Sequence, residues 1–332
     1  MYMNAYVATD SGLRSAMPLP RRSLVGIGLA AVATAAPAAI KAALQPEILA
    51  RFPNGTFLEN LIVTQAGLVR FTNYTARSVE AWSPSLGLGG SVPVPGHPVS
   101  LAIVGFGRIA VLVHGVPFTV GAAAMRGKSE IMLIDAQGAV GQRIALPEAV
   151  HPNGMMLLAA GMLLVADSAE GVIWAVDLGT ERCDVWYRHH ALRPDPSRSV
   201  PGVNGINRAG EALLLSNSAS RQLQRLTLRP NGVAVQGEVS LHAAMPFGVD
   251  DFCLAADGTI YAATHARGLA ALPPPGRLLP SQPAARLIDV PGLEGSTAVA
   301  MAPNHRALYA LATGGMLEGG QGEAVLARLP LG

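Results

Sequence analysis

The sequence predicts an all-β protein folded as a six-bladed β-propeller, and three observations carry this prediction. Short apolar runs of β-rich or alternating character, such as "GRIAVLVHG" and "RALYALATGG", are separated by glycine and proline turns, with no long helical periodicity. Units of this kind recur six times along the chain. Of the 332 residues, 50% are hydrophobic and 14% are charged, which suits a large core and excludes a disordered chain.

Residues 1–38 differ in character from the rest and predict a twin-arginine-like export signal, or else a flexible N-terminal segment. The segment contains Arg21 and Arg22, an apolar run over 24–36 and a small-residue end at 36–38. The run is short and alanine-rich, so we expect no stable membrane span in the mature protein, which would be periplasmic or secreted. A packed N-terminal helix, an uncleaved anchor and a start at Met17 remain open alternatives.

The propeller is expected over residues 39–332, because the six units are spaced about forty to fifty-five residues apart, the period of a four-stranded blade. Each unit opens with a polar residue before a short apolar strand. The six openings are "FLENLIV" at 57, "HPVSLAIV" at 97, "HPNGMMLL" at 151, "PGVNGINR" at 201, "GVDDFCLA" at 248 and "GSTAVAMA" at 295.

Charge and motifs exclude several function classes. The chain has 24 basic and 22 acidic residues and no basic stripe interleaved with aromatics, so no nucleic-acid partner is expected. The signatures of a serine-hydrolase elbow, a zinc protease, a phosphate-binding loop and a dinucleotide fold are missing from the sequence. Cys183 and Cys253 fall in different units and are expected to be free, buried thiols.

Oxygen-bearing side chains occupy the same position in several units. Because the innermost strand of every blade runs along the channel, residues at one phase of the repeat should meet at one level. These residues are Glu59, Asn153, Asn204 and Asp250 with its neighbour Asp251. Such a ring suits a hard divalent cation, which binds about six to eight oxygens, whereas facing carboxylates without a cation would repel each other. The alternative is that these side chains cap backbone amides at the blade entrances.

The motifs "LENL", "PNGM", "VNGI" and "VDDF" resemble those of the gluconolactonase, regucalcin and senescence-marker-protein family of six-bladed propellers, over roughly residues 50 to 330. More distantly, the chain resembles the paraoxonases and strictosidine synthases. The resemblance implies one metal ion held by Glu59, Asn153, Asn204 and Asp250, with Asp250 as general base. It also implies that Asn153 and Asp251 contact substrate. Calcium is the first expectation, with zinc, manganese or magnesium as alternatives.

The expected function is that of a divalent-metal-dependent hydrolase of lactones or esters. The metal would polarise the carbonyl and lower the pKa of a bound water, and Asp250 would take the proton. In the second blade, His97 and His114 could serve as a second base or a substrate contact. His265 could face the channel mouth or lie in the rim.

The substrate class stays open as a lactone, an ester or an apolar metabolite. His151 stands where an arginine often precedes the middle asparagine in gluconolactonases, and Met155 suggests a less polar pocket. The alternative class is a non-hydrolytic propeller, either a strictosidine synthase-like condensing or cyclising enzyme or a small-molecule binding or scaffold protein.

Overall fold

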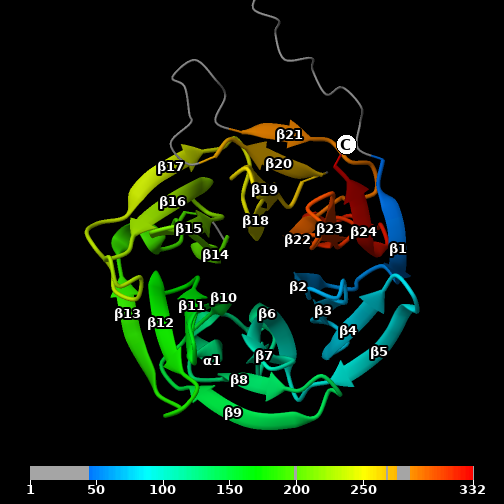
Figure 1. The fold of residues 1–332 in the computed structure, drawn as a ribbon. Helices are drawn as coiled ribbons and strands as arrows, with labels where there is room; N and C mark the ends of the chain where they lie inside the picture. The colour runs from blue at the N-terminus through cyan, green and yellow to red at the C-terminus, as the bar shows by residue number, and fades with distance from the viewer. Residues whose placement is uncertain (1–44, 198–199, 267, 275–284, 332) are drawn as a thin grey trace, which may run out of the picture. The chain divides into compact units, whose positions relative to one another are not determined.

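The computed structural model describes residues 45–197, 200–266, 268–274 and 285–331. The export signal expected at 1–38 lies outside these residues. The described residues belong to one compact unit, Ala42–Gly332. Within their bounds, they form six antiparallel four-stranded sheets arranged around a centre, which confirms the six-bladed β-propeller (Figure 1).

The first three blades follow the chain from the innermost strand outward. Blade 1 holds β2 (Leu58–Val63), β3 (Val69–Asn73), β4 (Ser78–Ser83) and β5 (Gly87–Pro93). Blade 2 holds β6 (His97–Gly105), β7 (Arg108–His114), β8 (Ser129–Ile134) and β9 (Val140–Leu146). Blade 3 holds β10 (Pro152–Ala159), β11 (Met162–Asp167), β12 (Val172–Asp177) and β13 (Cys183–Arg188).

The last three blades repeat this order, except that the sixth takes its outermost strand from the start of the propeller. Blade 4 holds β14 (Val203–Ala209), β15 (Ala212–Asn217), β16 (Gln222–Thr227) and β17 (Ser240–Ala244). Blade 5 holds β18 (Phe252–Leu254), β19 (Ile260–Ala263), β20 (Leu269–Leu272) and β21 (Arg286–Ile288). Blade 6 holds β22 (Ser296–Met301), β23 (Ala307–Ala312), β24 (Ala324–Pro330) and β1 (Glu47–Phe52).

Short helical turns lie in the connections between strands. Between β7 and β8 lie the 3-10 turn η1 (Phe118–Val120) and the four-residue helix α1 (Ala122–Met125). The turns η2 (His190–Leu192) and η3 (Met316–Glu318) follow β13 and β23. None of the helices in the described part of the chain is long and apolar enough to cross a membrane.

The ring closes through β1, which pairs antiparallel with β24 and completes blade 6. An ion pair between Glu47 and Arg328, 3.2 Å apart, joins the two strands at their rim. Closure protects the edges of blade 6, because an open outer edge on β24 would leave unpaired backbone groups available to other chains. The first strand therefore holds the two ends of the propeller together.

Apolar side chains pack between neighbouring blades and hold the inner strands at fixed positions. One cluster joins blades 1 and 6 through Leu58, Phe71 and Leu311, all fully buried. Another joins blades 2 and 3 through residues that include Leu112 and Leu163. Because each blade buries apolar surface against both neighbours, the polar residues at the channel are presented by a rigid support.

Candidate functional site

The inner strands share an irregularity at the residues that the sequence singles out. The pairing of β2 with β3 shifts register between Leu58 and Leu61, so Glu59 and Asn60 have no partner residue in the ladder. The pairing of β10 with β11 shifts between Pro152 and Met155, and that of β14 with β15 between Val203 and Ile206. Bulges of this kind re-aim side chains near functional sites.

The glycines that follow the two asparagines allow the inner strands to approach closely. A Cβ on Gly154 would lie 2.1 Å from the carbonyl oxygen of Asn204 in the next blade. A Cβ on Gly205 would lie 3.0 Å from the carbonyl oxygen of Asp250, one blade further. The two Asn-Gly pairs therefore occupy equivalent positions in successive blades, where the backbones of neighbouring inner strands come close together. They lie in strands rather than in hairpin turns.

Asn204 and Asp250 form a buried hydrogen-bonded pair across blades 4 and 5. Asn204 Nδ2 donates to Asp250 Oδ1 over 2.5 Å and to Ser218 Oγ over 3.2 Å. Ser218 Oγ in turn donates to the carbonyl of Val249 over 2.7 Å. This chain of contacts fixes the carboxyl group of Asp250, which is only 2% exposed.

The second carboxyl oxygen of Asp250 makes no hydrogen bond within the described residues. It lies 3.3 Å from His265 Nε2, in a geometry that does not form a hydrogen bond. Burial, and then the charge of Asp251, raise the pKa of Asp250 well above its usual range, whereas burial lowers the pKa of His265. Asp250 and His265 thus both favour their neutral forms, and His265 faces the site rather than the rim.

Glu59 lies on the blade 1 side of the same cluster, close to the side-chain amide of Asn153, which partly offsets the rise in the pKa of Glu59. Its Oε2 atom is buried and has no partner among the residues described. Burial raises the pKa of Glu59 strongly, and the charges of Asp250 and then Asp251 add to this increase. The structure therefore brings Glu59, Asn153, Asn204 and Asp250 to one buried region, as the sequence predicts.

The donor set of this region fits a hard divalent cation. Glu59 Oε2 and Asp250 Oδ2 are buried carboxyl oxygens without hydrogen bonds in the described structure, and Asn153 and Asn204 add two amides. The described residues contain no group of three or more His, Cys, Asp or Glu side chains placed to hold a metal, so the amides must complete the set. Asn204 directs its amide nitrogen toward Asp250. To bind a cation, the Asn204 amide must be flipped so that its oxygen faces the site.

His97 borders this region and has one free ring nitrogen. Its Nδ1 lies 2.9 Å from the carbonyl of Tyr74, which can only accept, so in the neutral ring Nδ1 carries the proton. Nε2 is then a lone-pair acceptor, and it has no partner within the described chain. Tyr74 stacks on the ring with centroids 4.6 Å apart. The geometry suits His97 for accepting a proton or a hydrogen bond.

His114 lies behind His97 and is held by the backbone of blade 3. Its Nε2 donates to the Pro152 carbonyl over 2.7 Å, and its ring centroid is 5.4 Å from that of His151. Burial, followed by the charges of His151 and His97, lowers the pKa of His114 to about 3, and burial also lowers that of His151. Both imidazoles are therefore neutral near pH 7, and His114 is a support rather than a free base.

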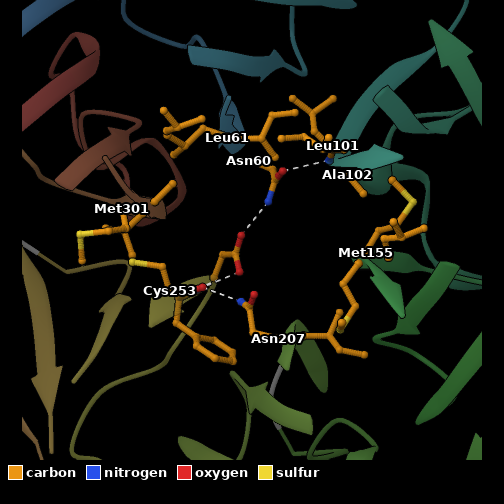
Figure 2. Close-up of a pocket in the computed structure, with 18 residues that line it drawn as sticks. Asn60, Leu61, Leu101, Ala102, Met155, Asn207, Cys253 and Met301 are labelled. Carbon is orange, nitrogen blue, oxygen red and sulfur yellow. Dashed lines mark hydrogen bonds between the residues drawn. The ribbon is translucent and has the colours of Figure 1, made fainter. Parts of the chain in front are cut away.

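Asp251 points away from this cluster, although it follows Asp250 directly. Its Oδ2 accepts from Asn60 Nδ2 over 2.6 Å, and its Oδ1 accepts from the Phe252 N–H over 2.8 Å. Burial raises the pKa of Asp251 to about 7. Asp251 and Asn60 line a cavity of about 290 Å³ formed by later residues of the inner strands, which does not include Asp250 (Figure 2).

Sequence reasoning missed Asn60, which links blades 1, 2 and 5. Its Nδ2 donates to Asp251, and its Oδ1 accepts from the Leu101 N–H over 2.9 Å. The sequence signal for Asn60 is its place directly after Glu59 in "LENL", because two consecutive residues inside one bulge can both face the channel. Cys183 and Cys253 are free thiols, as expected, although both are only partly buried.

No protein-family model matches the chain, and no curated protein matches it. A calcium-binding protein, regucalcin, from Agrobacterium tumefaciens is 15% identical with a TM-score of 0.63, over 87% of this chain and 94% of that one. A gluconolactonase from Xanthomonas campestris is 15% identical with a TM-score of 0.62, over 86% and 89% of the chains. A luciferin-regenerating enzyme is 13% identical with a TM-score of 0.63, over 86% and 95%. The chain therefore shares the six-bladed β-propeller fold of the regucalcin and gluconolactonase structures.

Proposed function

We propose that the protein is a divalent-metal-dependent hydrolase of lactones or esters. The observation that carries the proposal is the pair of buried carboxyl oxygens, Glu59 Oε2 and Asp250 Oδ2, which have no hydrogen-bond partner in the described structure. Leaving buried carboxyl oxygens unpaired costs stability, so such atoms are retained where a ligand satisfies them. A divalent cation is the ligand that two carboxylates and two amides match.

Glu59, Asn153, Asn204 and Asp250 would hold this cation. When bound, it would supply Lewis-acid polarisation of the substrate carbonyl. It would also lower the pKa of Glu59 and Asp250, both of which are raised chiefly by burial, with the charge of Asp250 adding to the increase for Glu59 and that of Asp251 for Asp250. Both side chains would then be ionised at neutral pH, as ligands must be.

Asp250 is the proposed general base. Its Oδ2 would bind the cation, and its Oδ1, released when the Asn204 amide turns its oxygen toward the cation, would accept the proton of the attacking water. His97 Nε2 is the proposed second acceptor, because its lone pair is unpartnered within the described residues and its ring is held by the Tyr74 carbonyl. These roles need no movement of the backbone.

The surroundings of the carboxylates favour a neutral, moderately apolar substrate. None of the groups that shift the pKa of Glu59 or Asp250 is a cation. The aromatic rings of Phe57, Tyr74 and Phe118 form a contact cluster next to His97, with the Phe57 and Tyr74 centroids 5.6 Å apart. A sugar acid would need a positive partner, so a neutral lactone or an ester fits this chemistry better.

The similar structures support the proposal at the level of the fold. One is a gluconolactonase and another is a calcium-binding regucalcin, which is why calcium is the first metal to test. The export signal expected in residues 1–38 adds the proposal that the mature protein acts on small molecules outside the cytoplasm.

The test combines elemental analysis with activity on an aryl acetate and on simple γ- and δ-lactones, with calcium, manganese or zinc, before and after chelation. We expect one bound divalent ion, loss of activity on chelation, and recovery with the metal. Glu59→Gln and Asp250→Asn should lose both metal and activity. Glu130→Gln makes the same chemical change on a surface ion pair with Arg143 and should lose neither. Hydrolysis that survives chelation and both inner variants would refute the proposal.

A further inference from the structure

A second hollow lies beyond the carboxylate cluster, toward the carboxyl ends of the inner strands. We call this cavity of about 290 Å³ the far-end cavity; residues from all six inner strands, together with Asp251, line it. Figure 2 shows Leu61, Leu101, Met155 and Met301 around it. Glu59, Asn153, Asn204 and Asp250 are not among the residues that line it. The far-end cavity is therefore separate from the proposed hydrolase site.

The polar groups of the far-end cavity converge on one spot. Figure 2 shows the amides of Asn60 and Asn207 reaching into its middle from opposite sides. Asn60 Nδ2 donates to Asp251 Oδ2, and Asn207 Nδ2 donates to the Phe252 carbonyl over 2.6 Å. Each bond uses one of the two N–H groups of its amide, whereas Asn207 Oδ1 accepts no hydrogen bond within the described chain. Each Asp251 oxygen also accepts only one hydrogen bond there, although a carboxylate oxygen can accept two.

The charges of the residues that line the far-end cavity determine which ligand charge it favours. Among the described residues that line the cavity, Asp251 is the only acid, and there is no Lys, Arg or His. Unused acceptors beside one carboxyl group attract hydrogen-bond donors and cations, and they repel anions. The remaining lining is mostly aliphatic side chains and methionines, which suits a short apolar body.

We propose that the far-end cavity binds a small primary amine with a short apolar chain or ring. Its ammonium group donates hydrogen bonds to Asp251 and to Asn207 Oδ1, and its apolar body packs between Leu61, Leu101 and Met155. The volume lies near the lower end of the roughly 300–1,000 Å³ found for small-molecule pockets, so a compact ligand is required. This site does not depend on the proposed hydrolase activity.

The first arm of the test titrates n-pentylamine, 1-pentanol and pentanoate into the full-length protein by calorimetry. We expect saturable one-to-one binding of pentylamine, at least tenfold weaker binding of pentanol, and no binding of pentanoate. Pentanoate binding as tightly as pentylamine would overturn the proposal, because it would show that only the apolar body is recognised. Absence of pentylamine binding would also overturn it.

The second arm places the amine in this cavity. Asp251→Asn should weaken pentylamine at least tenfold and change pentanol little. Ala300→Phe should abolish binding of both, because Ala300 lines the cavity and the added ring fills it. Asp184→Asn, which makes the same change at an exposed ion pair with Arg182, is the matched control and should bind pentylamine as the wild type does. Thermal unfolding checks that each variant is folded; if Asp251→Asn is not, Ala300→Phe carries the test. Unchanged pentylamine binding in folded Ala300→Phe would refute the site.

Discussion

Replacing His114 tests the buried histidine that supports the candidate site. Its Nε2 donates to the Pro152 carbonyl, its Nδ1 has no partner in the described structure, and its pKa is lowered to about 3 against an ordinary 6.5, first by burial. At pH values between these two, the His114 imidazole is protonated in the unfolded chain but stays neutral in the folded protein. The free energy of unfolding therefore falls as the pH drops from 6.5 toward 3. At pH 5 the gap of about 1.5 pH units corresponds to about 2 kcal/mol.

His114→Gln removes this titration and keeps a side-chain N–H that can reach the carbonyl. The assay is urea unfolding of the metal-free protein at pH 7, 6 and 5, followed by tryptophan fluorescence. We expect the difference in free energy of unfolding between wild type and variant to shrink by about 2 kcal/mol between pH 7 and pH 5. The control, Val113→Ala, removes a buried neighbour without a titratable group and should be destabilising to a similar extent at every pH. Parallel pH profiles for wild type and His114→Gln would refute the reasoning.

Three further predictions concern the inner strands and their support. Glu59→Gln and Asp250→Asn should lower hydrolysis at least about a hundredfold, yet leave the thermal midpoint of the metal-free protein unchanged or higher, since each replaces a buried carboxyl group, whose ionisation burial disfavours, with a neutral amide of the same shape; a large drop in that midpoint would contradict this account. Gly154→Ala should cost about 2 kcal/mol or more in urea unfolding and weaken calcium binding in calorimetry, because its Cβ would lie 2.1 Å from the Asn204 carbonyl oxygen. Asp167→Asn should cost about 3 kcal/mol in the same unfolding assay, because the buried Asp167 carboxylate accepts hydrogen bonds from four backbone N–H groups and an indole N–H. Wild-type stability of Asp167→Asn would show that these bonds are replaceable.

The openings of the six units located the inner strands closely. The opening at 97 coincides with the first residue of β6, and the opening at 295 precedes β22 by one residue. Turn residues and strand alternation are local signals, so blade starts can be found without knowing the fold. The closing strand β1 was not identified, because it is recognised only through its partner β24, far along the chain.

The Asn-Gly motifs show where local information stops. An Asn-Gly pair between apolar runs usually predicts a hairpin turn, but Asn153 and Asn204 lie in inner strands. Recurrence at one phase of the repeat was enough to predict that they lie in one region. The close approach of Gly154 to the Asn204 carbonyl, which explains the glycine, exists only when two blades are side by side.

Residue type and repeat phase therefore determined the all-β class, the six blades and the gathering of Glu59, Asn153, Asn204 and Asp250, because these depend on periodicity within each unit. Tertiary structure alone decided that Asp250 and Asp251 face different spaces, since a carboxyl group acquires its partners from other blades. It also decided which carboxyl oxygens are left unpaired and how far burial raises their pKa. Burial and cross-blade hydrogen bonds arise between residues distant in sequence, so no local pattern encodes them.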